Sequence, residues 1–164
     1  MNFQEAALGA DLAVWRLVKE KYITEAFSGR GAKLYPGRWH NKGAGVVYTA
    51  GSVSLAILEM LVQAAVIPVY WSVRATLPRG LPVTRLELAS LPDDWRDSPA
   101  PGLIRAIGSE WYAAGQSCAL AVPSSLVPSE FNYILNPEHP DFSRMIIGAG
   151  EKIPLDGRLM KGAK

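Results

Sequence analysis

Hydrophobic residues along this chain gather in short runs, and stretches rich in glycine, proline and aspartate separate the runs. The runs carry many β-branched and aromatic residues, which is typical of strands in a partly buried sheet. They predict strands over residues 13–18, 46–49, 68–77, 83–88, 118–122, 131–135 and 143–147. The pattern therefore favours a protein built mainly from short strands.

Two further segments show helical periodicity. One covers residues 103–114, and Gly115 is suited to end it. The other follows Ser52, which we expect to be its N-cap. Its apolar residues share one broad face, which predicts a mostly buried helix: Leu55, Leu58, Leu61, Val62 and Ala65. Glu59 and Gln63 form a narrow polar seam beside that face.

Glu59 is the residue of most chemical interest in that helix. A carboxylate at the edge of an apolar face needs a cation or a hydrogen-bond donor, or else it takes up a proton. Arg16 and Arg38 are the nearest candidate partners in the sequence. Arg16 is also unusual because it interrupts an apolar strand. The alternatives are that Glu59 lies at a rim in water and that Arg16 extends from an edge strand to solvent.

Loops account for most of the remaining polar residues. Residues 28–37 hold three glycines and a proline, which predicts a loop with positive φ positions and no phosphate-binding fingerprint. Residues 91–101 form another loop, in which Asp93 and Asp94 lack the neighbouring ligands that a metal ion needs. Ser124 and Ser125 follow a strand, but no G-x-S-x-G elbow surrounds them, so a serine hydrolase is rejected.

Composition and charge disfavour nucleic-acid-binding, secreted and membrane proteins. The chain has 164 residues, of which 49% are hydrophobic, and this suits a single domain over residues 1–164. Seventeen Lys and Arg residues against fifteen Asp and Glu leave a net charge of +2 without a basic stripe, which disfavours direct nucleic-acid binding. Cys118 is the only cysteine, so a reducing, cytoplasmic location is expected. Neither a secretion signal nor an apolar run of about 18 residues is present, so we expect no membrane contact.

Several short motifs, in this order, resemble the RES domain, the toxin half of bacterial RES-Xre toxin–antitoxin pairs. They are WR (15–16), SGRGA and PGRW (within 28–39), VVYTA (46–50), SLAILE (54–59), VPSSLVPSEFNYILNPEHPDF (122–142) and DGRL (156–159). The resemblance covers almost the whole chain. It implies an ADP-ribosyltransferase-like α+β fold, in which helices flank a split, mainly antiparallel β core that grips NAD. The many short strands and two helices agree with that fold.

The resemblance also implies site residues and partners. The expected catalytic residues are Glu59, Arg38, Tyr48 and Ser124, and the expected NAD-binding residues are Arg16, Arg38, Tyr48, Ser124, Ser125 and Asn132. NAD would be the substrate, without a metal. The expected partner is an Xre-type DNA-binding antitoxin that blocks the active site in a hetero-oligomer.

Chemistry gives each of these residue types a reason. Glu59 would stabilise the oxocarbenium-like ribose that forms when the nicotinamide bond breaks. Arg16 and Arg38 would pair with the diphosphate, and Tyr48 would stack on the nicotinamide. Family members hydrolyse NAD, phosphorolyse it, or transfer its ADP-ribose to a protein. A catalytically silent nucleotide-binding module is the alternative of another class.

Overall fold

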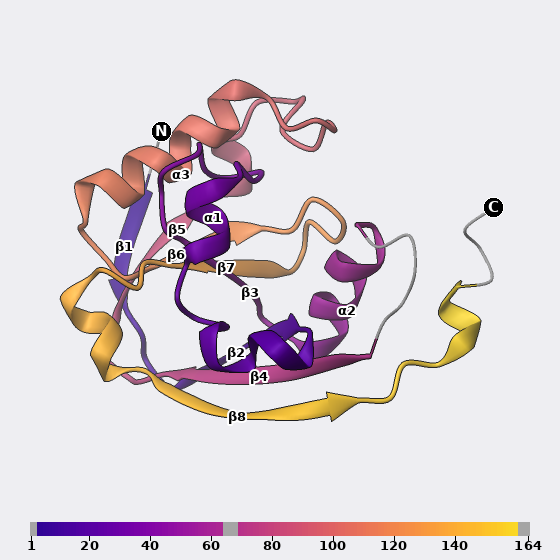
Figure 1. Ribbon diagram of the computed structural model, residues 1–164. Coiled ribbons are helices and arrows are strands. Elements are labelled where there is room, and N and C mark those ends of the chain that lie inside the picture. Colours follow the sequence, from indigo (N-terminus) through magenta and orange to yellow (C-terminus); the bar gives the residue numbers. More distant parts are fainter. Residues whose placement is uncertain (1–2, 64–68, 161–164) are drawn as a thin grey trace.

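The centre of the fold is one mixed sheet of eight strands in the computed structural model, which describes residues 3–63 and 69–160 (Figure 1). In sheet order the strands are β1 (Phe3–Ala7), β5 (Pro82–Leu86), β6 (Ala119–Pro123), β7 (Phe131–Leu135), β3 (Val47–Ala50), β2 (Leu12–Val18), β4 (Tyr70–Leu77) and β8 (Ile146–Ile153). Among these strands, β5 and β6 alone run parallel, and the other neighbours are antiparallel. The expected α+β, mainly antiparallel fold is confirmed.

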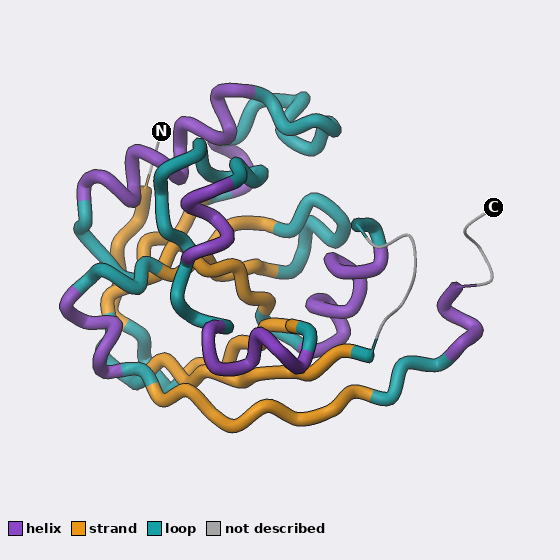
Figure 2. The backbone as a smooth tube through the Cα atoms, in the orientation of Figure 1, coloured by secondary structure: helices purple, strands orange, loops and turns teal. Residues whose placement is uncertain are grey.

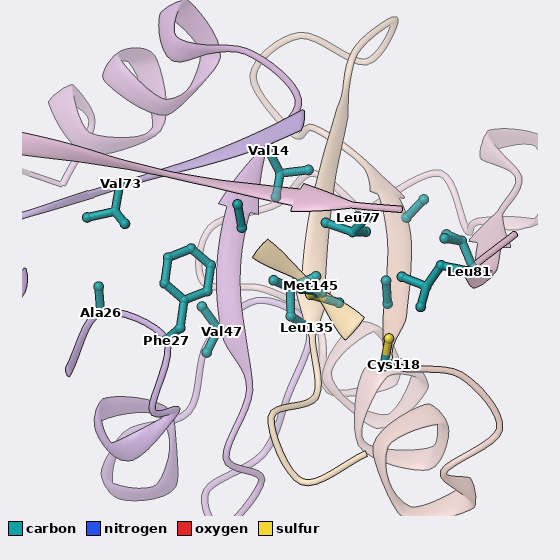
Figure 3. Close-up of a cluster of buried hydrophobic side chains, with 14 of the residues drawn as sticks. Val14, Ala26, Phe27, Val47, Val73, Leu77, Leu81, Cys118, Leu135 and Met145 are labelled. Atoms are coloured by element: carbon teal, nitrogen blue, oxygen red, sulfur yellow. The ribbon is translucent and has the colours of Figure 1, made fainter. Parts of the chain in front are cut away.

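The sheet divides between β2 and β3. These two strands share a single register pair, Trp15 with Ala50. On either side of that pair, β1, β5, β6, β7 and β3 form one half of the sheet, and β2, β4 and β8 form the other. Val14 and Val73 from the second half lie in the same buried cluster as Val47 and Leu135 from the first (Figure 3). The two halves therefore face each other across this cluster, which is the split core that was expected.

Residues 3–63 and 69–160 form three α-helices and four 3-10 helices besides the sheet. Figure 2 shows these helices around the strands. They are η1 (Glu20–Glu25), α1 (Arg30–Leu34), α2 (Val53–Leu61), η2 (Leu88–Ser90), α3 (Gly102–Ala114), η3 (Pro140–Arg144) and η4 (Gly157–Met160). Helix α3 ends at Gly115 with φ of 58°, as predicted. Its Ile104, Ile107 and Trp111 pack against Leu120 of β6 in a second buried cluster.

Helix α2 differs from its predicted burial. Ser52 caps it as expected, with its side chain accepting a hydrogen bond from Leu55 N at 3.1 Å. Leu55 is buried against the partly buried Trp15 of β2. Leu58 and Val62, however, are 43% and 63% exposed, so the prediction of a mostly buried helix is wrong. The reason is that α2 buries one stripe against β2 and β3, and no described element covers the rest. The expected Ala65 lies outside the described residues.

Two other predictions need correction, and one strand was missed. Residues 28–37 are not all loop, because α1 begins after Gly29, whose φ is 71°. The strand predicted over residues 143–147 begins only at Ile146, since η3 precedes it, and it continues to Ile153. Strand β1 was not predicted at all. Both β1 and β8 are exposed edge strands, so they lack the burial that produces a hydrophobic pattern. Position 68, the predicted start of β4, lies outside the described residues.

Candidate functional site

Glu59 lies at the centre of a small polar cluster built from three elements. Its Oε1 accepts a hydrogen bond from Ser124 Oγ at 2.9 Å and another from Asn132 Nδ2 at 2.6 Å. Glu59 is half-buried and Ser124 is fully buried. Glu59 therefore meets, within hydrogen-bond distance, two residues that lie 65 and 73 positions further along the chain.

The sheet register explains why they meet. Asn132 of β7 pairs with Val122 of β6 on one side and with Ala50 of β3 on the other. Ser124 directly follows β6, and α2, the helix that carries Glu59, begins just after β3. The side chains of Ser124 and Glu59 therefore both lie beside Asn132. Ser124 Oγ also accepts hydrogen bonds from the backbone of residues 126 and 127 at 3.1 and 3.2 Å. Those bonds hold the chain as it turns away from the sheet.

Two oxygen atoms of the cluster have no hydrogen-bond donor in the described part of the chain. Glu59 Oε1 is held by two donors, whereas no donor in the described part of the chain contacts Oε2. Asn132 Oδ1 is buried and has no hydrogen-bond partner in the same part. A buried polar atom without a partner is costly and points to a group that is supplied from outside. The cluster thus combines one fixed carboxylate oxygen with two oxygens that lack a donor among the described residues.

Arg16 occupies the place where the two halves of the sheet diverge. Its NH1 donates to the backbone carbonyl of Tyr48 at 3.0 Å, next to the single pair that joins β2 and β3. Burial lowers the pKa of the Arg16 guanidinium. Its Nε is buried without a hydrogen-bond partner among the described residues. Arg16 therefore binds β3 where the two halves of the sheet separate, and its Nε donor has no partner among the described residues.

Arg38 is bound to the loop over residues 91–101. Its NH1 donates to the carbonyls of Trp95 and Asp97 at 2.9 and 3.0 Å. The side chain between those carbonyls, Arg96, donates from Nε to the carbonyl of Ser125 at 2.8 Å. Arg38 and Arg96 together tie this loop to the segment that follows β6. Arg96 was missed in the sequence because it lies in a polar loop without any motif.

Tyr48 is locked by hydrogen bonds within the protein. Its hydroxyl accepts from Trp39 N at 3.1 Å and lies 2.8 Å from His40 Nδ1. His40 Nε2 lies 3.1 and 3.0 Å from the carbonyls of Ala32 and Tyr35, so Nε2 is the donor and Nδ1 accepts from the phenol. Burial raises the pKa of Tyr48, so it remains a neutral phenol. The hydroxyl is therefore engaged within the protein, and the ring packs against the second buried cluster.

The structure thus separates the expected site residues into two groups. Glu59, Ser124 and Asn132 form one hydrogen-bonded cluster. The expectation that Arg16 or Arg38 pairs with Glu59 is wrong for the described residues, because those arginines bind backbone carbonyls instead. Ser125 contributes its carbonyl to Arg96. The hydrogen-bond donors to Glu59 are uncharged, and sequence patterns do not distinguish such donors from arginine.

Metal-binding clusters and membrane-spanning helices are both absent from the described residues. Residues 3–63 and 69–160 contain no group of three or more His, Cys, Asp and Glu side chains placed to hold a metal ion. None of the helices in those residues is both long and apolar enough to cross a lipid bilayer.

Comparison with known proteins identifies the family of this chain. The RES domain model matches residues 13–156, which include every residue of the polar cluster. "Toxin Res" of Photorhabdus laumondii is 40% identical over 158 residues, covering 93% of this chain and all of the relative. "Toxin Res" of Yersinia enterocolitica is 37% identical over 134 residues, covering 80% of this chain and 88% of the relative. "Prs ADP-ribosylating toxin" of a Sphingobium species is 33% identical over 157 residues, covering 91% of this chain and 97% of the relative. The chain belongs to the RES domain family.

Proposed function

We propose that this protein is the toxin of a toxin–antitoxin pair and that it consumes NAD⁺ by cleaving the bond between nicotinamide and ribose. The observation that carries the proposal is the Glu59 carboxylate, with one oxygen held by Ser124 and Asn132 and the other without a donor in the described chain. Relatives named as toxins, up to 40% identical, support the biological role.

The reaction breaks the bond between the nicotinamide nitrogen and ribose C1. The bonding electron pair leaves with the nitrogen, which neutralises the pyridinium, and positive charge develops on the ribose. A fixed carboxylate beside the ribose stabilises that charge without reorganising during the reaction. Water or phosphate then bonds to C1, and any proton it releases passes to solvent or to Glu59. The products are nicotinamide and either ADP-ribose or ADP-ribose 1″-phosphate.

Other residues of the cluster suit the remaining parts of the substrate. Asn132 Oδ1 can accept a hydrogen bond from a ribose hydroxyl or from the carboxamide. Arg38 uses NH1 on the protein and keeps other nitrogens for a diphosphate oxygen. The Arg16 Nε, the side chain of Ser125 and the ring of Tyr48 are further groups for NAD. Ser124 acts by positioning Glu59, because its hydroxyl is fully engaged.

Transfer of ADP-ribose to a protein is the second candidate. It is favoured by the Sphingobium relative, whose name is "Prs ADP-ribosylating toxin" and which is 33% identical. The same bond breaks, and a nucleophilic side chain of the target protein takes the place of water at C1. The two candidates therefore require the same cluster and differ only in the acceptor.

Nicotinamide release tests the proposal. The purified protein should release nicotinamide from NAD⁺ in water, in phosphate buffer, or with a cell lysate, and phosphate-dependent ADP-ribose 1″-phosphate would identify phosphorolysis. Labelled NAD⁺ with lysate would identify a protein acceptor. Glu59→Gln should lose turnover by about a hundredfold or more while it still binds NAD⁺. Glu110→Gln, an exposed glutamate of α3, is the matched control. Binding without release in all conditions, with normal growth on expression, would identify a silent nucleotide-binding module instead.

An antitoxin of the Xre type is the partner that fits this proposal. Leu58 of α2 and Val62, the C-cap of that helix, are exposed within about one turn of Glu59, so a partner that covers them would also close the site. An adjacent reading frame with a helix-turn-helix pattern would support this partner. Leu58→Asp should weaken the complex without unfolding the toxin, because this side chain is 43% exposed. Equal inhibition of the variant by the antitoxin would place the interface elsewhere.

A further inference from the structure

Arg96 is joined to the polar cluster of Glu59 through the segment that follows β6. Its Nε donates to the carbonyl of Ser125 at 2.8 Å, and the neighbouring Ser124 donates to Glu59 Oε1 at 2.9 Å. These two contacts and the covalent path between them place Arg96 Nε no more than about 15 Å from the Glu59 carboxylate. Arg96 is exposed, so its guanidinium is open to a ligand that reaches Glu59.

The loop over residues 91–101, which carries Arg96, covers the same face of the sheet as the polar cluster. Asn132 and Ile134 of β7 are two positions apart, so their side chains point to the same side. Ile134 lies in the second buried cluster together with Trp95, the residue before Arg96. Figure 1 shows the loop extending from the start of α3 toward the side on which α2 lies. The loop and the Glu59 carboxylate therefore belong to one face of the molecule.

Arg38 and Arg96 both keep a positive charge that no carboxylate neutralises. Arg38 NH1 donates to the carbonyls of Trp95 and Asp97. Arg96 Nε donates to the carbonyl of Ser125. In the part of the chain that the structure describes, none of the ion pairs includes either arginine. Two guanidinium groups on one loop repel each other, and an anion bound to both removes that repulsion.

The hydrogen bonds leave one edge of each guanidinium for a ligand. A guanidinium carries five N–H donors in a planar fork. Arg96 uses its Nε, so the end formed by its two terminal nitrogens has no acceptor among the described residues. Arg38 uses NH1, so the edge formed by its Nε and NH2 is likewise without an acceptor there. Each edge matches two oxygens of one phosphate, and two edges match the two phosphates of a diphosphate.

We propose that Arg96 binds the diphosphate of the substrate together with Arg38, so that the loop over residues 91–101 forms a wall of the substrate site. The proposal rests on the proposed function for the other end of the substrate, whose nicotinamide ribose would lie beside Glu59. Arg96 then contributes to binding and not to bond cleavage. Its loss should raise KM for NAD⁺ and leave kcat nearly unchanged.

Calorimetry with ADP and adenosine tests the contact with phosphate. Arg96→Gln separates charge from structure, because the glutamine amide nitrogen takes the place of the arginine Nε and can still donate to Ser125. Arg96→Gln and Arg96→Ala should each weaken ADP binding by about tenfold or more, and this loss should shrink at high salt. Affinity for adenosine, which has no phosphate, should not change. Arg79→Ala, at an exposed arginine between β4 and β5, is the matched control.

Kinetics with two substrates give a second test. Nicotinamide riboside contains the same scissile bond as NAD⁺ but has no phosphate. Arg96→Gln should raise KM for NAD⁺ by about tenfold and leave kcat/KM for nicotinamide riboside at the value of the parent protein. Equal losses for both substrates would show that Arg96 acts on Glu59 through Ser125, and they would overturn the proposal.

The outcome is separable from that of the proposed function. If the protein cleaves no NAD⁺, loss of ADP affinity in Arg96→Gln with unchanged adenosine affinity still supports the phosphate site. If the protein cleaves NAD⁺ and Arg96→Gln keeps both the ADP affinity and KM, Arg96 only holds the loop, and the reaction stands without it. Arg96→Lys keeps the charge but not the planar fork, so it should recover part of the ADP affinity.

Discussion

Asn132 Nδ2 donates to Glu59 Oε1 across 2.6 Å, and the amide oxygen on the other side of Asn132 is buried without a partner in the described chain. The orientation of the amide is determined by this contact, because a rotated amide would place its oxygen against the carboxylate. Asn132 therefore holds the Glu59 carboxylate with its amide nitrogen, while its amide oxygen is the acceptor that lacks a partner. A substitution at this position should affect chemistry more than folding.

Asn132→Asp should abolish most turnover. The new carboxylate would lie against Glu59 and repel it, and the hydrogen bond that holds Oε1 would be lost. We expect kcat for nicotinamide release to fall by about a hundredfold, the usual cost of losing one preorganised hydrogen bond at a reacting charge. Saturating NAD⁺ assays measure it, with Asn41→Asp at an exposed position as the control. Unchanged kcat would show that Asn132 has no part in the reaction.

Ser124→Ala and Ser125→Ala should differ in stability and in rate. Ser124 is fully buried and makes three hydrogen bonds, two of them from backbone N–H groups. Its loss should lower the free energy of unfolding by about 1–3 kcal/mol and should slow nicotinamide release. The Ser125 side chain is partly exposed, so Ser125→Ala should stay within about 0.5 kcal/mol of the parent protein. Urea unfolding resolves the two, and equal effects would contradict the assignment of Ser124.

Local patterns predicted the buried strands of this fold, missed the edge strand β1 and misplaced the bounds of the edge strand β8. Strand β7 has the predicted bounds, Phe131–Leu135, because both of its faces meet packed side chains. Strand β1 is exposed along its whole length and is held by pairing with β5 alone. Hydrogen bonds between backbones do not depend on side chains, so this pairing produces no pattern of polar and apolar residues. The depth of burial therefore determined which strands a pattern could predict.

The candidate site was predicted in its residues but not in its connections. Glu59 was recognisable as a carboxylate on an apolar helix that needed a partner. The actual donors, Ser124 and Asn132, lie 65 and 73 positions away, and the sheet register alone brings them there. From the sequence, Arg16 and Arg38 are favoured as partners of Glu59 because they carry the opposite charge. In the structure, Arg16 donates to a backbone carbonyl where the two halves of the sheet separate, and Arg38 donates to a carbonyl of a loop. No sequence pattern predicts these two contacts.

Gly108→Ala should destabilise the protein although alanine is the better helix former. A Cβ on Gly108 of α3 would lie 1.8 Å from the carbonyl oxygen of Trp39, the residue after Arg38. The helix must then move, at a cost of about 1–3 kcal/mol that exceeds a gain of about 1 kcal/mol in helix propensity. Gly31→Ala in α1 is the matched control, since nothing lies within 4 Å of its Cβ. Thermal unfolding should rank Gly31→Ala as the more stable, and the reverse order would refute this close approach.

Cys118 should make the fold sensitive to alkaline pH. Burial raises the pKa of its thiol from 9.0 to about 11, and the Asp141 carboxylate adds to the effect. The unfolded chain loses this proton near pH 9, while the folded protein keeps it until about pH 11. Stability from this group is therefore complete below pH 9 and declines by roughly 3 kcal/mol as pH rises through that window.

Comparison with Cys118→Ala isolates this contribution from the tyrosines that also titrate at high pH. The variant should lose a constant amount of stability at pH 7 to 8 because it leaves a small cavity in the core. From pH 9 to 10.5 its free energy of unfolding should then fall less steeply than that of the parent, as urea titrations at each pH would measure. Parallel curves over the whole range would mean that the thiol ionises as easily in the fold as in water. Such a reactive thiolate would contradict its burial among Val83, Ala119 and Leu135.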